Sequence, residues 1–97
     1  MEIKQTAMAG TLESSDLQIV LSQGTKGIEF DLTSDVAKQF GNDIKATIKS
    51  VLDAYDIENA SVKVVDKGAL TPVIKARAIT AAQRALDLKD QPNWEVL

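Results

Sequence analysis

Apolar and polar residues alternate along three short segments of the chain, a period-2 pattern that is typical of β-strands with one buried face. The segments are residues 17–21, 28–32 and 60–65. The side chains that this pattern places toward the core are Leu17, Ile19, Leu21, Ile28, Phe30, Leu32, Val62 and Val64. Residues 2–9 alternate only loosely, and we predict a further, N-terminal strand there.

Two of these strands are close neighbours in the sequence. Residues 22–27 between them contain two glycines, which is typical of a turn. We therefore predict that residues 17–32 form a hairpin with a longer loop. Glu29 and Asp31 are the polar positions of its second strand and are expected to face water.

The spacing of apolar residues changes from two to three or four after Thr33, which predicts an amphipathic helix. Its expected N-cap is Ser34 or Asp35, since either side chain can accept a hydrogen bond from the first turn. The apolar stripe consists of Val36, Phe40, Ile44, Ile48, Val51, Leu52 and Tyr55. Gly41 costs about 1 kcal/mol relative to alanine inside a helix, so it marks either a close approach to the sheet or a break between two helical pieces.

A second helix is predicted to begin near Thr71. This residue is a suitable N-cap, and Pro72 is tolerated at the first helical position because the donor it lacks would be unpaired there. The predicted buried stripe consists of Leu70, Val73, Ile74, Ala78, Ala81, Ala82, Ala85 and Leu86. Its many alanines indicate close packing against the first helix or the sheet.

The predicted order of elements is strand, strand, strand, helix, strand, helix. This order predicts an α+β fold, a two-layer sandwich in which two helices cover one face of a mostly antiparallel, four-stranded sheet. The length of 97 residues suits one domain, 1–97, of which residues 87–97 form a C-terminal tail. Trp94 either pins this tail to the core, the interpretation we favour, or docks to a partner.

Composition and charge narrow the classes of function. The formal net charge is −3, which argues against a nucleic-acid module, since such a module needs a clustered excess of Lys and Arg. Aromatic residues make up only 4% of the chain, so we expect an aliphatic core with Phe30, Phe40 and Tyr55 as its few bulky fillers. No apolar run approaches the roughly 20 residues of a membrane helix, and the N-terminus lacks the apolar core of a signal peptide. We expect a cytoplasmic protein that binds neither nucleic acid nor membranes.

The chain contains neither cysteine nor histidine. Thiol nucleophiles, Ser-His dyads and structural zinc sites are therefore excluded. The acid pairs Asp31 with Asp35 and Asp87 with Asp90 lack the ligand density of a calcium loop, so we expect no metal site. These absences disfavour an enzyme, whereas a carrier that acquires its thiol after translation needs none of the missing groups.

A small, hydroxyl-rich turn joins the first two predicted strands and reads Ala9-Gly10-Thr11-Leu12-Glu13-Ser14-Ser15-Asp16. Together with Lys38-Gln39-Phe40-Gly41 and Asp66-Lys67-Gly68-Ala69-Leu70, it resembles the acyl carrier (gamma) subunit of citrate lyase over most of the chain. In that family the serine after Gly-Thr-Leu-Glu, here Ser14, is joined through a phosphodiester to phosphoribosyl-dephospho-coenzyme A. The thiol of this covalent arm carries the acyl chain.

The resemblance implies a non-catalytic subunit of a lyase complex that converts citrate to acetate plus oxaloacetate in citrate fermentation. Acetyl and then citryl are carried as thioesters on the arm. The alpha subunit exchanges acetyl for citryl, and the beta subunit cleaves citryl to oxaloacetate. A holo-carrier synthase that attaches the arm and an acetate ligase are further implied partners.

Attachment of an arm requires an exposed Ser14 hydroxyl, so residues 10–16 are expected to be solvent-exposed and outside regular helix. The base that activates the hydroxyl must come from the modifying enzyme, because this chain has no histidine. Gly10 is expected to allow backbone conformations closed to other residues and so to hold the loop away from the sheet. Ser15, directly after Ser14, is a departure from commoner members of the family.

Other interpretations remain open. A carrier of the malonate decarboxylase type uses the same type of arm, and an unmodified α+β interaction or sensing domain would use residues 10–16 only as a turn. Ser15-Asp16-Leu17 contains the letters of the Asp-Ser-Leu motif of four-helix acyl carriers in a different order and leads into a strand, so it is not that motif.

The charged residues near the serine also allow two interpretations. Glu13 and Asp16 either solvate the turn, which we favour, or form an acidic patch for basic residues of partner enzymes. Lys75 and Arg77 similarly belong either to a solvated helical face or to a partner contact. The Asp66-Lys67-Gly68 turn, which leads into the second helix, is either an ordinary turn or a receptor for a phosphate of the arm.

Overall fold

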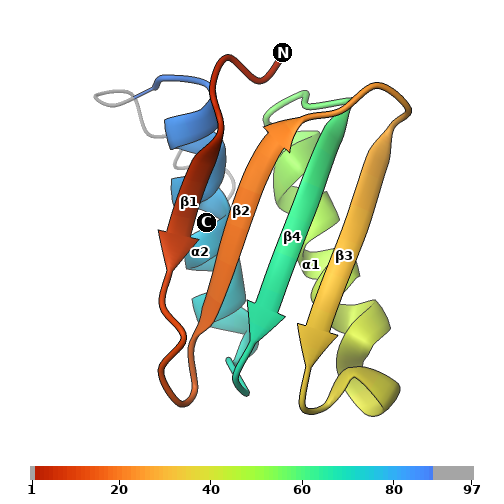
Figure 1. Cartoon of the computed structure of the whole chain (residues 1–97), viewed down its shortest axis with the longest axis vertical. Coiled ribbons are helices and arrows are strands. Elements are labelled where there is room, and N and C mark those ends of the chain that lie inside the picture. Colours follow the sequence, from red (N-terminus) through yellow and green to blue (C-terminus); the bar gives the residue numbers. More distant parts are fainter. Residues whose placement is uncertain (1, 89–97) are drawn as a thin grey trace.

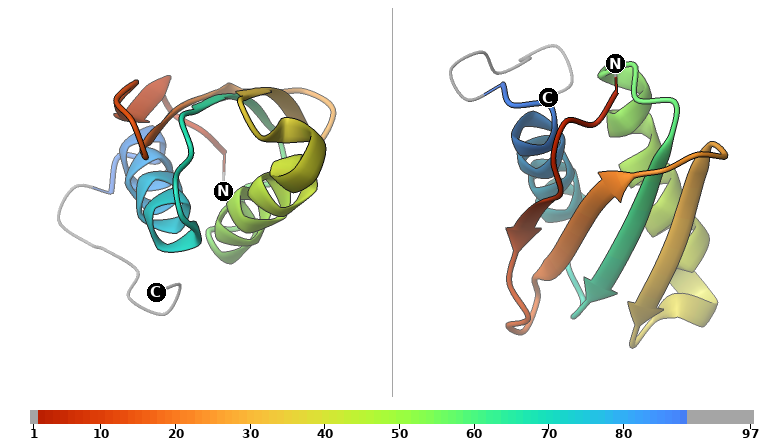
Figure 2. Two further views of the ribbon diagram at one scale, coloured as in Figure 1. Left: turned by 90° about the horizontal axis from the view of Figure 1, so that it is seen from below. Right: turned by 45° about the horizontal axis from the view of Figure 1, so that its top comes forward.

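The structure is a computed structural model in which residues 2–88 are described. Within them the elements are β1 (Ala7–Gly10), β2 (Leu17–Gln23), β3 (Ile28–Ser34), α1 (Ala37–Ala54), β4 (Ala60–Asp66) and α2 (Thr71–Ala85). The strands form one four-stranded sheet, and both helices cover the same face of it (Figure 1). The views in Figure 2 show the same two layers from the end and at a tilt. The predicted α+β sandwich is thus confirmed.

The order of strands in the sheet is β1-β2-β4-β3. β2 pairs antiparallel with β1 and with β4, and β3 pairs parallel with β4, so the sheet is mostly antiparallel. β2 and β3 are not neighbours, and the hairpin predicted for residues 17–32 is wrong. β4 occupies the place between them because Val62 and Val64 are completely buried, whereas the apolar side chains of β3 are only half-buried and suit an edge.

The first strand is shorter than predicted, since β1 contains only Ala7–Gly10 of the expected residues 2–9. The residues before it attach to the end of α2 instead. The backbone N–H groups of Lys4 and Gln5 both donate to the carbonyl of Ala85, at 2.9 and 3.3 Å. These bonds satisfy donors that have no partner strand there.

The N-cap residues of both helices differ from the prediction. Val36 occupies the N-cap position of α1, and no side chain caps that end. Ser34 ends β3 instead, where its hydroxyl accepts a hydrogen bond from the Val36 N–H at 3.1 Å. At α2 the N-cap position is held by Leu70, and Thr71 is already the first helical residue.

Helix α1 runs without a break through Gly41. A methyl group added at this glycine would lie 3.6 Å from the side chain of Leu32 in β3. Gly41 is buried, and it marks the place where the helix comes close to the sheet. Of the two interpretations of this glycine, the close approach is the one that the structure adopts.

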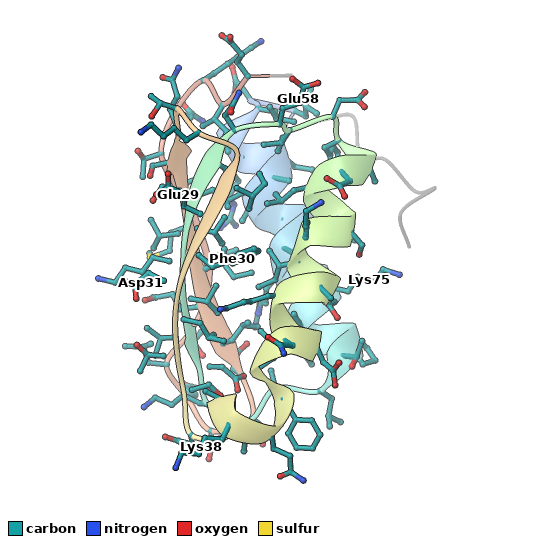
Figure 3. All side chains as sticks on the ribbon, turned by 90° about the vertical axis from the view of Figure 1, so that its right-hand side faces the viewer. Glu29, Phe30, Asp31, Lys38, Glu58 and Lys75 are labelled. Atoms are coloured by element: carbon teal, nitrogen blue, oxygen red, sulfur yellow. The ribbon has the colours of Figure 1, made fainter. Side chains whose placement is uncertain are left out.

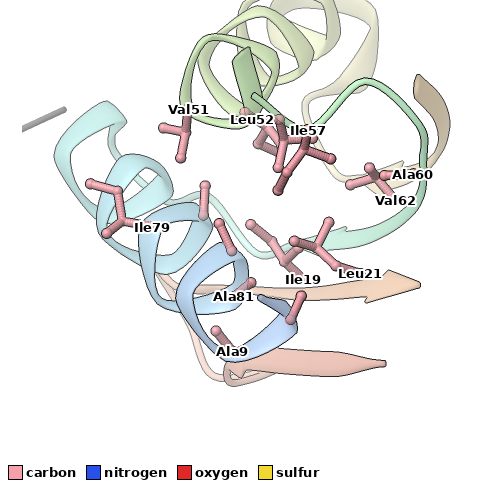
Figure 4. Close-up of a cluster of buried hydrophobic side chains, with 14 of the residues drawn as sticks. Ala9, Ile19, Leu21, Val51, Leu52, Ile57, Ala60, Val62, Ile79 and Ala81 are labelled. Atoms are coloured by element: carbon pink, nitrogen blue, oxygen red, sulfur yellow. The ribbon is translucent and has the colours of Figure 1, made fainter. Parts of the chain in front are cut away.

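The core lies between the sheet and the helices (Figure 4). Ile19 and Leu21 of β2 and Val62 of β4 project into it, and each such aliphatic side chain stabilises the fold by about 1.5–3 kcal/mol. Three alanines of α2, Ala81, Ala82 and Ala85, are completely buried, as expected for a closely packed helix. On β3, Phe30 points toward the helices while Glu29 and Asp31 point away from them, as predicted (Figure 3).

Three apolar residues depart from the predicted stripes. Phe40 of α1 is 45% exposed and Leu70 before α2 is 73% exposed, although both were expected in the core. They lie at the starts of the two helices, where both line an open groove. Ile79, which the predicted stripe of α2 omits, is buried. Trp94 and the rest of the predicted tail beyond residue 88 lie outside the described residues.

Candidate functional site

Three connections meet at one end of the sheet: β1 to β2, β3 to α1 and β4 to α2. They form the lower end of the molecule in Figure 1 and face the viewer in the left view of Figure 2. This arrangement follows from the topology, since β1, β3 and β4 all end there and β2 begins there. Segments that are far apart in the sequence are thereby brought together around the serine-containing loop.

Ser14 lies in the connection between β1 and β2, outside any helix, and its side chain is exposed. Residues 11–15 are all exposed, as predicted, whereas Gly10 and Asp16, at the two ends of the predicted range 10–16, are half-buried. Within residues 2–88 the Ser14 hydroxyl has no hydrogen-bond partner, so no hydrogen bond must be broken before this oxygen reacts. The loop thus presents the hydroxyl groups of two adjacent residues, Ser14 and Ser15, to solvent.

The loop is closed by hydrogen bonds that converge on Asp16. The Thr11 hydroxyl donates to one carboxylate oxygen at 2.7 Å, and the Leu17 N–H donates to the other at 2.8 Å. The Thr11 hydroxyl also accepts the N–H of Glu13 at 3.2 Å. The N–H of Asp16 in turn donates to the carbonyl of Glu13 at 3.2 Å. Ser14 therefore lies at the tip of a loop whose two ends are fastened to each other.

Arg77 of α2 binds the carboxylate of Asp16 through two nitrogen atoms of its guanidinium group. Its Nε donates to Asp16 Oδ1 at 3.0 Å and its Nη2 donates to Oδ2 at 2.9 Å, which is the bidentate geometry of a strong charge-assisted pair. The side chain of Asp16 is 13% exposed and that of Arg77 is 39% exposed. The hydrogen bond from Arg77 lowers the pKa of Asp16 below its ordinary range, with a further contribution from Thr11. The same pairing raises the pKa of Arg77.

This pair corrects the interpretation of Asp16 and Arg77 as solvated surface charges. Asp16 is not available as an acidic patch either, because Arg77 already neutralises it. Glu13, by contrast, is exposed beside Ser14, and Lys75 points away from the sheet on the outer side of α2 (Figure 3). The contact between Asp16 and Arg77 could not have been read from their spacing of 61 residues.

The loop is also fastened to the turn between β4 and α2. The N–H of Ser15 donates to the carbonyl of Lys67 at 2.8 Å, and the N–H of Lys67 donates to the carbonyl of Asp16 at 2.9 Å. Ser15 adopts a left-handed backbone conformation with φ of 65°, which is uncommon for a residue other than glycine. The reciprocal bonds to Lys67 offset the cost of that conformation, and they fix the direction in which the loop leaves the sheet.

Gly10 is required where the loop begins. Its φ is 92°, and a side chain there would overlap the carbonyl oxygen of Leu17 on the neighbouring strand. The expectation that Gly10 adopts a conformation closed to other residues is confirmed. It brings the two strand ends together, however, and does not hold the loop away from the sheet.

Asp66 has a structural role at this end that its position in the Asp66-Lys67-Gly68 turn did not indicate. It is 1% exposed and ends β4, and it accepts hydrogen bonds from the Ser34 hydroxyl at 2.7 Å and from the Ala69 N–H at 2.9 Å. It thus joins the end of β3 to the turn before α2. Because a carboxylate occupies this turn, the turn is a poor receptor for a phosphate.

Neither a metal site nor a membrane span is found in the part of the chain that the structure describes. No three potential ligands among His, Cys, Asp and Glu gather there, and Asp31 and Asp35 do not form such a group. Asp90 lies outside that part. No helix there is long and apolar enough to cross a bilayer.

The sequence and the fold are both similar to those of known proteins. Residues 4–85 match the family described as malonate decarboxylase delta subunit. The fold is similar to a chain in the crystal structure of a Pseudomonas malonate decarboxylase hetero-tetramer, with a TM-score of 0.74 over 88% of each chain and 17% sequence identity. At that identity the likeness concerns the fold alone.

The similarity to named sequences is much closer. The chain is 75% identical to a citrate lyase acyl carrier protein of Leuconostoc mesenteroides subsp. cremoris, over the full length of both. Proteins of the same name from Leuconostoc citreum and Weissella paramesenteroides are 74% and 66% identical over the same length. The chain belongs to the citrate lyase acyl carrier protein family. The family and the named relatives support an acyl carrier role for this chain.

Proposed function

We propose that this chain is the carrier subunit of a citrate lyase complex, and that Ser14 bears phosphoribosyl-dephospho-coenzyme A through a phosphodiester. The observation that carries the proposal is the exposed Ser14 hydroxyl at the tip of a fastened loop, directly after Gly10-Thr11-Leu12-Glu13. A carrier without cysteine must obtain its thiol from an attached group. When bound, that group supplies a thiol on which acyl chains are held as thioesters.

The residues of the chain fit this group in three respects. The Ser14 oxygen is accessible to a modifying enzyme and has no competing partner among residues 2–88. The ion pair of Asp16 with Arg77 and the backbone bonds between Ser15 and Lys67 hold the attachment point in one orientation. The neighbouring loop residues are exposed, so they leave room for a bulky substituent.

The chain's own contribution is tethering and presentation. A group held on a short flexible link reaches an effective concentration of order millimolar at neighbouring active sites, without release into solvent. In the proposed complex, an alpha subunit exchanges acetyl for citryl on the carrier and a beta subunit cleaves citryl to oxaloacetate. A holo-carrier synthase attaches the arm, and an acetate ligase is a further partner.

A carrier of the malonate decarboxylase type is the second candidate. The family matched by residues 4–85 favours it. The relatives at 66–75% identity over the full length, all named citrate lyase acyl carrier protein, outweigh that family description. An unmodified interaction domain would leave the exposed Ser14 without a use.

Mass spectrometry of the intact protein, made together with its modifying enzymes, tests the proposal. We expect one added phosphoribosyl-dephospho-coenzyme A group, located on Ser14 by peptide mapping. Ser14→Ala should abolish both the added mass and acyl transfer, whereas Ser15→Ala should retain them. Both hydroxyls are exposed, so either replacement is expected to change the free energy of unfolding by no more than about 0.5 kcal/mol.

An unmodified mass under these conditions would support the interaction domain. An arm found on Ser15 would refute the residue assignment and leave the carrier role standing. The choice between the two carrier types is made by transfer with purified subunits. Release of oxaloacetate from citrate supports citrate lyase, and decarboxylation of malonate supports the alternative.

A further inference from the structure

An apolar groove opens between the N-terminal ends of α1 and α2, at the same end of the molecule as Ser14. We call it the α1–α2 groove. Its volume is about 360 Å³, and its apolar lining consists of Val36, Phe40, Ile44, Ala69, Leu70 and Ile74. Phe40 and Leu70, two of the exposed large hydrophobic residues, form part of this lining. The volume falls in the range of small-molecule sites.

The groove and the serine loop share one turn of the chain. Asp66 and Gly68 line the groove, and Lys67 between them exchanges two backbone hydrogen bonds with Ser15 and Asp16. A group attached to Ser14 therefore begins one residue away from the turn that borders the groove. The other hollows near Glu2 and Gln23, by contrast, lie at the opposite end of the sheet.

The charges around the groove select which part of the arm could enter. Asp43 and Asp66 are the charged residues that line it, and no Lys or Arg lines it within the described chain. Phosphate groups would be repelled by these carboxylates. The neutral pantetheine part of the arm, with its methyl groups and amides, matches an apolar lining that also offers the hydroxyls of Thr47 and Thr71.

We infer that the α1–α2 groove is a resting site for the pantetheine part of the arm that Ser14 carries. This inference rests on the proposed function. Covering Phe40 and Leu70 with the arm removes apolar surface from water, and the tether makes the event intramolecular. The arm then alternates between the groove, where its thiol is shielded, and the active sites of partner subunits.

Thiol reactivity provides the test, because the chain has no cysteine and the arm carries the single thiol of the loaded protein. The probe is the neutral reagent dipyridyl disulfide, applied to deacylated protein whose loading has been verified by mass. A docked fraction of about two-thirds would slow the reaction about threefold relative to free dephospho-coenzyme A. The double variant Phe40→Ser, Leu70→Ser should restore the rate of the free compound.

The variants are chosen so that they fold. Serine and phenylalanine have similar helix propensity at Phe40, and serine is a preferred residue at the N-cap position that Leu70 occupies. The matched control is Met8→Ser, which alters another exposed large hydrophobic residue, 52% exposed and on the strand β1. It should react at the wild-type rate. Methyl NMR of Ile44 and Ile74 should show shifts on loading that disappear in the double variant.

Equal reaction rates for wild-type protein, the double variant and free dephospho-coenzyme A would overturn the inference. So would NMR shifts confined to residues 11–16. If the double variant instead loses acyl transfer while its thiol reactivity stays at the wild-type value, the groove binds a partner subunit and not the arm. Failure of the proposed function is told apart from failure of this inference by the mass measurement that precedes the thiol reaction. Protein without added mass has no thiol to titrate.

Discussion

Asp16 and Ser14 differ in how far the sequence alone indicates a role for them. Ser14 could be proposed as the attachment site because the residues that mark it, Gly10 to Glu13, are adjacent in the chain. The partner of Asp16 is Arg77, which approaches only because the sheet brings α2 beside the loop between β1 and β2. A carboxylate in a hydroxyl-rich turn is usually solvated, so local chemistry pointed to the wrong interpretation.

Replacing Asp16 with Asn is expected to lower the free energy of unfolding by about 1–2 kcal/mol at neutral pH. The figure is at the lower end for hydrogen bonds to charged groups because the Arg77 side chain is 39% exposed and partly screened. The folded state lowers the pKa of Asp16 from 3.8, so the pair stabilises the fold fully above about pH 4. This contribution is lost as the pH falls toward the folded pKa. Urea unfolding at a series of pH values should show the two proteins converging in acid.

The pair of Lys49 and Asp53 on α1 provides the control. It is also an ion pair, at 3.0 Å, but its side chains are 56% and 58% exposed. Asp53→Asn should cost no more than about 0.5 kcal/mol. If Asp53→Asn and Asp16→Asn destabilise the protein equally, or if the effect of Asp16→Asn is the same at pH 7 and about pH 3, the assigned role of Asp16 is contradicted.

The helices and strands were predictable because their apolar periods are local properties of the chain. The order of the strands was not. Pairing depends on which strand can be buried between two neighbours. β4 therefore pairs with β2, although β3 follows β2 more closely in the sequence. The start of α1 was misplaced for a similar reason, since Ser34 uses its hydroxyl to bind Asp66 of another strand.

The start of the loop between β1 and β2 depends on Gly10, and a comparison of two glycines tests this. Gly10 and Gly68 both have positive φ, 92° and 87°. A methyl group at Gly68 would meet nothing within 4 Å, whereas one at Gly10 would overlap the backbone of Leu17. Gly68→Ala should therefore cost only the left-handed strain of about 1–2 kcal/mol, and Gly10→Ala about 3 kcal/mol or more. Thermal unfolding of the two variants measures the difference.

Equal destabilisation of the two variants would show that the strand ends can separate without penalty. In that case Gly10 would contribute only its backbone conformation. A smaller effect at Gly10 than at Gly68 would contradict the close contact between β1 and β2 altogether.

Different sets of residues stabilise the fold and orient the loop that contains Ser14. Stability comes mainly from aliphatic side chains between the sheet and the helices, such as Ile48, which is completely buried. The orientation of Ser14 comes from polar contacts at one end, which bury little apolar surface. A change in the core should therefore leave the loop intact as long as the protein remains folded.

Two variants of similar global stability separate these tasks. Ile48→Val is expected to lower the free energy of unfolding by about 0.5–1.5 kcal/mol, which overlaps the loss expected for Asp16→Asn. If the proposed function holds, the rate at which a holo-carrier synthase attaches the arm should be unchanged by Ile48→Val, because the loop contacts are untouched. The attachment rate should fall several-fold in Asp16→Asn, because Arg77 no longer holds the loop in one orientation. The synthase must then order the loop when it binds, and this ordering costs binding free energy. The rates are measured by intact mass at neutral pH, where both variants are folded. Equal slowing of both would mean that attachment follows global stability, and no effect in either would mean that the synthase accepts a loosened loop.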